Sequence, residues 1–240
     1  MNSTNTDTAE QEVIDSVRRA REEEVRFFSC AAKPERERWV VHEFLMRLGL
    51  KFFDRELNSE VGDSPVDVTF RSARFQIKEI SDPAQRRHAE IKESLQRAQK
   101  ATTLRDLVGP VTARDIVLAD VSKLLFEIAA TSKYSPKVKS DLDLLVYVTR
   151  PHAGFNEPHR VAANKLKSLG WRSISCLFGE KPLLLVATSY SPPFLCPTDQ
   201  TPNQAMQRTA PALMRSFGVV SLSSCQPRAL SGAVADLVSR

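Results

Sequence analysis

Cysteine is scarce in this chain, which has 4 cysteines among its 240 residues. Cys30, Cys176, Cys196 and Cys225 lie far apart, form no CxxC pair and are matched by no pattern of histidines. Zinc sites and disulfide frameworks usually show close, regular spacing of such residues. The sequence therefore predicts reduced thiols, as in a cytoplasmic protein, and argues against a zinc site.

Long apolar runs are also lacking. The longest, "LLVYV" and "PLLLVA", are far shorter than the roughly 20 residues of a membrane span. The first residues, "MNSTNTDTAEQEV", are polar and acidic, unlike a signal peptide. The 8 glycines are scattered singly, so no glycine-rich phosphate loop is present. No serine or cysteine lies in a recognisable motif with a base, which leaves covalent catalysis without support.

What the chain does contain suits one main domain with a hydrophobic core, since 42% of its residues are hydrophobic. The net charge of +5 permits a polyanionic partner without requiring one. We expect an N-terminal helical extension over residues 1–32 and an α/β domain over 33–190. The proline-rich segment 191–240 is expected to be a poorly ordered tail, or alternatively to carry a peripheral helix near "ALSGAVADLVS".

Hydrophobic periodicity predicts the order of helices and strands. Helices are expected over 9–28, 34–48, 83–101, 112–132 and 159–170, the first opened by a capping box of Thr8 and Gln11. Strands are expected over 50–57, 141–149, 171–178 and 182–190, together with a hairpin over 65–80. The strand 141–149 is apolar on both faces, as central strands are. This order predicts an α/β fold with a mixed central sheet flanked by helices.

The hairpin "PVDVTFRSARFQIKEI" alternates apolar and polar residues on both sides of a turn at Ser72 and Ala73. The register predicted from this pattern pairs Phe70 with Phe75 and Val68 with Ile77 on the apolar face, and Asp67 with Lys78 and Thr69 with Gln76 on the polar face. An acid, an amide and a lysine therefore converge, although many residues separate them along the chain.

Those polar residues are the parts of a simple magnesium site. Mg²⁺ prefers oxygen ligands and keeps several waters, so one or two carboxylates and a carbonyl can hold it. Asp67, the side-chain oxygen of Gln76 and the backbone carbonyl of Ile77 could supply the ligands, with Lys78 beside them. Glu37, which lies on the apolar stripe of the helix 34–48, could add a second carboxylate.

Simpler interpretations remain open for the same residues. Asp67 and Lys78 could form an ordinary cross-strand ion pair on a solvated sheet face, worth a fraction of a kcal/mol. Glu37 could be an acid near the start of its helix that interacts with the helix dipole.

The arrangement of Asp67 followed by Gln76-Ile77-Lys78 on the next strand resembles the motif of the PD-(D/E)xK nuclease superfamily. The tracts "ERERWV", "DVTFRSARFQI", "LDLLVYV" and "GWRSIS" are similar to those of an uncharacterised bacterial endonuclease-like family, over roughly residues 33–188. The resemblance implies a restriction-endonuclease-like αβββαβ core and a Mg²⁺-dependent (or Mn²⁺-dependent) endonuclease that hydrolyses DNA phosphodiester bonds.

By the same resemblance Asp67, Gln76 and Ile77 would hold the metal, Lys78 would be the catalytic lysine, and Glu37 would assist. Two departures stand out: Val66 replaces the motif's proline, and Gln76 replaces a carboxylate, which weakens magnesium binding. The alternative is therefore a catalytically inactive protein of the same fold that binds nucleic acid or a protein partner. A structural or regulatory α/β protein without a nucleic-acid role is a third hypothesis.

Basic residues in two segments are candidate phosphate contacts. They are Arg86 and Arg87 of the helix 83–101, and Lys133, Tyr134, Lys137 and Lys139 of the flexible loop expected at "SKYSPKVK". A solvated helix face and a plain connecting loop are the alternatives. The expected partner is nucleic acid, with DNA favoured over RNA; a homodimer is compatible with the sequence, and no membrane association is expected.

Overall fold

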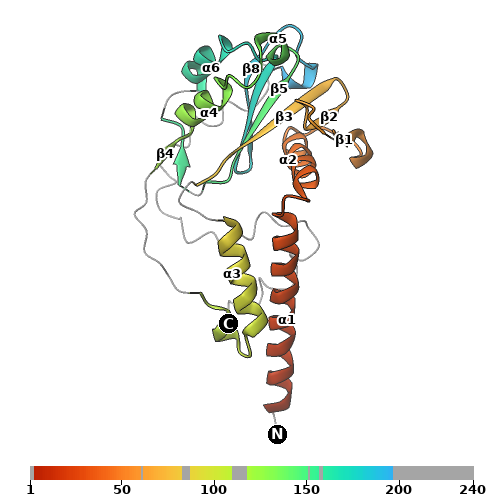
Figure 1. Ribbon diagram of the computed structural model, residues 1–240, viewed down its shortest axis with the longest axis vertical. Helices are drawn as coiled ribbons and strands as arrows, with labels where there is room; N and C mark the ends of the chain where they lie inside the picture. Colours follow the sequence, from red (N-terminus) through yellow and green to blue (C-terminus); the bar gives the residue numbers. More distant parts are fainter. Residues whose placement is uncertain are drawn as a thin grey trace. The chain divides into compact units, whose positions relative to one another are not determined.

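The central feature of the computed structural model is a six-stranded mixed sheet with strand order β1-β2-β3-β5-β7-β8 (Figure 1). The structure describes residues 3–60, 62–82, 87–109, 118–150, 152–156 and 159–196. The strands of the sheet are β1 Leu57–Ser59, β2 Val68–Phe70, β3 Ala73–Ile80, β5 Asp143–Val148, β7 Ser173–Phe178 and β8 Lys181–Ala187. β3, β5 and β7 run parallel, while the outer pairings are antiparallel. A second sheet pairs β4 Ala119–Asp120 with β6 Ala153–Gly154.

Helices cover both faces of the main sheet. α2 Lys33–Arg47 packs on one face, and α4 Val121–Ala129 and α6 His159–Lys167 pack on the other. α1 Ser3–Phe27 and α3 Arg87–Lys100 pack mainly against each other, and α5 Pro136–Lys139 is a single turn between α4 and β5 in the chain. The short 3₁₀ turns are η1 Asp54–Glu56, η2 Leu104–Leu107 and η3 Pro193–Leu195. The predicted α/β class with a mixed sheet is confirmed. The expected αβββαβ order is found in α2, β1, β2, β3, α4 and β5, with α3 and β4 inserted before α4 and α5 inserted before β5.

Two hydrophobic cores lie on opposite sides of the sheet. One joins α2 to the hairpin and includes Phe44, Phe75 and Leu145, while the other joins α4 and α6 to the sheet and includes Leu125 and Leu144. Leu144 and Leu145 are consecutive residues of β5 and are both buried, so this strand is covered on both faces as predicted.

Several elements begin where the sequence did not place them. α1 starts at Ser3, so the predicted capping box at Thr8 is wrong. No strand spans 50–57; the Glu56 carboxylate accepts a hydrogen bond from the Phe53 amide and closes the turn η1, so β1 begins only at Leu57.

The helix predicted over 112–132 is shorter than expected. Asp120 Oδ1 accepts a hydrogen bond from the Ser122 amide and caps α4, which therefore begins at Val121. The expected residues 112–117 lie outside the described part of the chain, as do residues 83–86 of the basic helix. Residues 136–139, expected to be a loop, form α5, because Ser135 caps it and Pro136 suits its first position.

The hairpin has a different register from the predicted one. Val68 pairs with Phe75, and Phe70 pairs with Ala73, around a turn in which Arg71 has a φ of 51°. The prediction was therefore displaced by two residues. Because strand side chains alternate with a period of two, this displacement leaves every side chain on its predicted face.

The fold continues beyond the boundary expected at residue 190. Leu195, in η3, is fully buried in the core beneath α2, and Ser191 donates a hydrogen bond to the carbonyl of Arg172. Residues 197–240, which include most of the expected tail, lie outside the described residues. Among the residues that are described, no helix is both long and apolar enough to cross a membrane.

Candidate active site

The structure brings together the polar residues that the sequence singled out. Asp67 lies immediately before β2, and Gln76, Ile77 and Lys78 lie on the adjacent strand β3. Glu37 comes from the second turn of α2, where its side chain is only 13% exposed. The negative charges of Asp67 and Glu37 both act on Lys78, so the three groups share one electrostatic environment.

Asp67 is fixed by β3 through one carboxylate oxygen. Its Oδ2 accepts a hydrogen bond of 2.7 Å from the Ile77 amide and another from Nε2 of Gln76. Its Oδ1 lies 3.7 Å from Nζ of Lys33, and the side chain is 11% exposed. The carboxylate is thus anchored on one side and directed toward α2 on the other.

Lys33, at the start of α2, bridges the two carboxylates. Its Nζ lies 3.3 Å from Oε1 of Glu37 as well as 3.7 Å from Oδ1 of Asp67. Burial lowers the pKa of Lys33, but the charges of Glu37 and Asp67 outweigh this effect and raise it overall. Burial raises the pKa of Glu37, and the neighbouring charge of Asp67 raises it further. The pair of acids therefore favours any cation that can lie between them.

Gln76 is buried, with 3% of its surface exposed, and both ends of its amide are used. Nε2 donates to Asp67, while Oε1 accepts a hydrogen bond of 2.6 Å from the hydroxyl of Tyr134. The oxygen expected to bind metal therefore already has a protein donor. An amide oxygen has two lone pairs, so one acceptor position is left on this atom.

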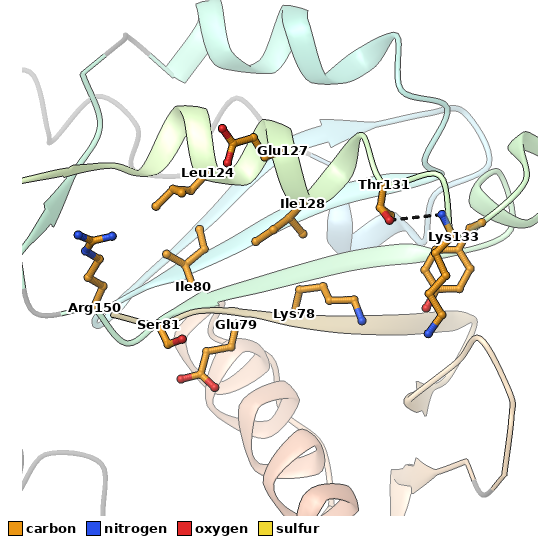
Figure 2. Close-up of a pocket in the computed structure, with 11 residues that line it drawn as sticks. Lys78, Glu79, Ile80, Ser81, Leu124, Glu127, Ile128, Thr131, Lys133 and Arg150 are labelled. Atoms are coloured by element: carbon orange, nitrogen blue, oxygen red, sulfur yellow. Dashed lines mark hydrogen bonds between the residues drawn. The ribbon is translucent and has the colours of Figure 1, made fainter. Parts of the chain in front are cut away.

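Lys78 lies beside the carboxylates on the α4 side of the sheet. Burial lowers the pKa of its amine, and the positive charges of Lys133 and Lys33 lower it further, while Asp67 acts in the opposite sense. In Figure 2 its chain extends along the sheet toward Lys133. The next residue, Glu79, is on the opposite face and accepts hydrogen bonds from Tyr147 and Thr149, so it cannot replace Gln76 as a ligand.

A pocket of about 520 Å³ opens next to Lys78, between β3 and α4 (Figure 2). Its apolar lining comes from Ile80, Leu124 and Ile128. Its polar lining contains three cations, two acids and three hydroxyl side chains: Lys78, Lys133, Arg150, Glu79, Glu127, Ser81, Thr131 and Tyr134. Lys133 and Arg150 lie toward opposite ends of the pocket.

The candidate phosphate contacts separate into four groups. Lys133 and Tyr134 line the pocket, and Lys137 is exposed on α5. Lys139 is instead buried, with 7% of its surface exposed. Its Nζ donates a hydrogen bond of 3.1 Å to the carbonyl of Ala129 and lies over the ring of Trp171. Arg86, and the side chain of Arg87, lie outside the described part of the structure.

Sequence reasoning missed two cations. Lys33 precedes Glu37 by four residues, a spacing that brings helical side chains together, and this signal was available. Arg150 carried no such signal, because it meets Lys78 and Lys133 around the pocket only through the pairing of β3 with β5 and the position of α4.

The donor set suits a hard divalent cation such as Mg²⁺ or Mn²⁺ better than a softer ion that prefers thiolate or imidazole ligands. The described residues contain no cluster of three or more His, Cys, Asp or Glu side chains that could hold an ion. Two carboxylates, the Ile77 carbonyl and water nevertheless match the way in which Mg²⁺ is bound by few protein ligands. The ammonium of Lys33 lies between the two acids and compensates the negative charge that such an ion would otherwise compensate.

Comparison with known proteins supplies a family. A family model described as "Putative endonuclease, protein of unknown function (DUF1780)" matches residues 9–201. No curated protein matches the chain. A solved structure of a protein of unknown function from Pseudomonas aeruginosa strain PAO1, described as belonging to the monooxygenase superfamily, is 23% identical with a TM-score of 0.47. That match covers 77% of this chain and 89% of the other.

Proposed function

This chain belongs to the DUF1780 family of endonuclease-like proteins, and from that membership we propose that it is a divalent-metal-dependent endonuclease hydrolysing DNA phosphodiester bonds. The observation that carries the proposal is the pair of largely buried carboxylates, Glu37 and Asp67, which share the ammonium group of Lys33 and whose charges both act on Lys78. The order α2, β1, β2, β3, α4, β5, apart from the insertions α3, β4 and α5, supports the proposal because it agrees with the αβββαβ order of a PD-(D/E)xK core.

In this proposal Asp67, Glu37 and the Ile77 carbonyl would hold Mg²⁺ or Mn²⁺, and the remaining acceptor position of Gln76 could contribute a further oxygen ligand. The bound ion would lower the pKa of a water molecule and compensate charge on the scissile phosphate. Lys78 orients the attacking water and stabilises the negative charge that develops on the phosphate oxygens. Its lowered pKa reflects a half-buried position, in which an ammonium interacts more strongly than in water.

Positively charged side chains near the site would hold the DNA backbone. Lys133 and Lys137 are both exposed and lie in or next to the segment that contributes Tyr134. Contacts of this kind are independent of base sequence and give affinity that falls steeply with salt.

A plasmid-nicking assay tests the proposal. Purified protein should nick supercoiled DNA in Mg²⁺ or Mn²⁺ but not in EDTA, and Lys78→Ala should abolish nicking. Lys181→Ala, which removes an exposed lysine at the start of β8, is the matched control and should retain full activity. Nicking that persists in Lys78→Ala would overturn the assignment.

A second candidate function is nucleic-acid binding without cleavage. It is favoured by one observation: the amide of Gln76 stands where a carboxylate ligand is expected, and it is held by Asp67 and Tyr134. This function predicts salt-dependent DNA binding with no nicking in either metal, whereas an endonuclease shows both.

A further inference from the structure

We propose that the pocket beside Lys78 binds one unpaired nucleotide, so that the preferred substrate is single-stranded DNA or a strand opened next to the scissile bond. This inference rests on the proposed function and concerns the surface next to the carboxylate pair, with Lys78 common to both. The carboxylate pair lies between α2 and the hairpin, whereas the pocket lies between β3 and α4.

The size of the pocket fits a nucleotide and not a helix. Its volume of about 520 Å³ falls within the roughly 300–1,000 Å³ range of sites for small molecules. A duplex is far larger than such a cavity, and its bases are covered on both faces by their neighbours. Only a base that has left the stack can enter, as happens in enzymes that extrude a nucleotide.

The pocket offers a base an apolar surface. Ile80 extends from the end of β3, and Leu124 and Ile128 extend from α4 toward it (Figure 2). Tyr134 adds an aromatic wall, and its ring is fixed by the hydrogen bond to Gln76 and by an edge contact with Trp171 at 5.9 Å. Apolar and aromatic surfaces of this kind bind the faces of bases without reading their sequence.

The charges at the pocket suit the phosphates on either side of that base. Lys78 and Lys133 lie at one end and Arg150 at the other (Figure 2). Two carboxylates also line the pocket: Glu127 on α4, and Glu79, which accepts hydrogen bonds from Tyr147 and Thr149 on the other face of β3. The three cations outnumber these two acids. A cation at each end with an apolar floor between them is complementary to a phosphate–base–phosphate segment of a single strand.

Equilibrium binding in EDTA tests the inference without cleavage. Fluorescence anisotropy would compare a labelled oligothymidylate with a labelled duplex of the same length. We expect the single strand to bind about tenfold more tightly, because stacking on the pocket floor is available only to an unpaired base. Ile128→Trp, which fills the pocket, should lower single-strand affinity about tenfold and leave duplex affinity unchanged.

Phe126→Trp is the matched control: Phe126 lies on the same helix, is 39% exposed and does not line the pocket. Arg150→Ala gives an independent readout that does not depend on filling the cavity, since it should reduce the salt dependence of single-strand binding by about one phosphate contact. This second variant keeps the inference testable if Ile128→Trp does not fold.

Equal affinity for the two DNAs would overturn the inference, as would unchanged single-strand binding in both Ile128→Trp and Arg150→Ala. The proposed function is judged separately by nicking. If Ile128→Trp and Arg150→Ala leave binding unchanged while Lys78→Ala abolishes cleavage, the endonuclease assignment stands and the pocket assignment fails.

Discussion

The hydroxyl of Tyr134 donates a hydrogen bond of 2.6 Å to Oε1 of Gln76. This contact joins the segment after α4 to the centre of β3, and it determines which end of the amide faces Asp67. Because the oxygen is turned toward Tyr134, the amino group is turned toward Asp67 and donates to its carboxylate. The chain thereby stabilises an acid pair in the absence of metal by supplying two donors, Gln76 and Lys33.

Gln76→Glu should make the stability of the fold depend on bound Mg²⁺. The new carboxylate cannot donate to Asp67 and faces it as a like charge, so in EDTA we expect a loss of about 1–3 kcal/mol in the free energy of unfolding. Added Mg²⁺ should restore most of that loss and bind more tightly than to the wild type. Denaturant unfolding with and without Mg²⁺, and calorimetric titration of Mg²⁺, measure both effects.

Gln11→Glu is the matched control, because Gln11 also donates to an aspartate, Asp15, but on the exposed surface of α1. It should change stability by less than about 0.5 kcal/mol. Equal stability of Gln76→Glu and wild type in EDTA would show that the hydrogen bond from Gln76 to Asp67 does not stabilise the metal-free fold.

Lys33→Met should strengthen metal binding a few-fold. The ammonium competes with a bound ion for Glu37 and Asp67, but its side chain is 60% exposed, so this competition is worth no more than about 1 kcal/mol. Calorimetric titration with Mg²⁺ and Mn²⁺ measures the change. Lys51→Met, which alters an exposed lysine in the segment before η1, is the control; weaker metal binding in Lys33→Met would make Lys33 a contributor to the site instead of a competitor.

Glu37→Gln should stabilise the metal-free protein at neutral pH. Burial and the charge of Asp67 raise the pKa of Glu37 in the folded state, so the folded protein holds this proton to a higher pH than the unfolded chain does. Stability contributed by the protonated form is present at low pH and is lost as the pH rises through the folded-state pKa. The gain in the free energy of unfolding that glutamine gives over glutamate should therefore appear above that pKa and vanish below about pH 4.

Thermal unfolding of Glu37→Gln in EDTA across this pH range measures the effect, and Glu12→Gln on the exposed face of α1 is the control. The same variant should lose the stabilisation that Mg²⁺ gives to the wild type. A melting temperature below that of the wild type at pH 7 would show that the contact with Lys33 outweighs the cost of burying the charge.

Lys139 and Lys137 should respond in opposite ways to substitution by alanine. Lys139 is buried and donates to the carbonyl of Ala129, which also accepts from Nε1 of Trp171 at 2.8 Å. Lys139→Ala should cost about 1–3 kcal/mol of stability and leave DNA affinity unchanged in the folded fraction. Lys137→Ala should leave stability within about 0.5 kcal/mol and weaken DNA binding. Chemical unfolding and anisotropy titrations distinguish the two residues.

Asp143→Ala should destabilise the fold more than any of the preceding substitutions. Asp143 is fully buried at the start of β5 and accepts hydrogen bonds from the guanidinium of Arg172, the hydroxyl of Ser173 and the Arg74 amide. Its removal leaves Arg172 without its charge partner, which costs about 3–5 kcal/mol when an ion pair is buried. Asp141→Ala, an exposed aspartate two residues earlier, should cost little. A loss below about 1 kcal/mol for Asp143→Ala in denaturant unfolding would show that solvent or neighbouring groups replace its contacts.

Local pattern predicted the elements that have a strong period or a clear boundary. The helix 34–48 was recognised because Pro34 opens it and Gly49, with a φ of 77°, follows its end, and the observed α2 spans Lys33–Arg47. The strand at 141–149 was recognised by its apolar run. The errors fall where one contact moved a boundary, as when the side chain of Asp120 capped α4 and excluded the preceding residues from the helix.

The hairpin shows that the sequence pattern determines which residues share a face but not which residues pair. Alternation determined which residues share a face, so Asp67, Gln76 and Lys78 were grouped correctly although the register was displaced by two. A period of two contains no information about displacements by an even number, and the turn at Arg71 settled the pairing.

By itself, the sequence determined the layer design of this protein and the set of polar side chains that meet on one hairpin, since both follow from periods only a few residues long. Only the tertiary structure decided that Gln76 turns its oxygen to Tyr134, that Lys33 lies between two acids, and that Lys139 is buried with its ammonium over the ring of Trp171. Those outcomes depend on segments brought together by the packing of helices on the sheet, and no local pattern encodes the direction in which a side chain finds its partner.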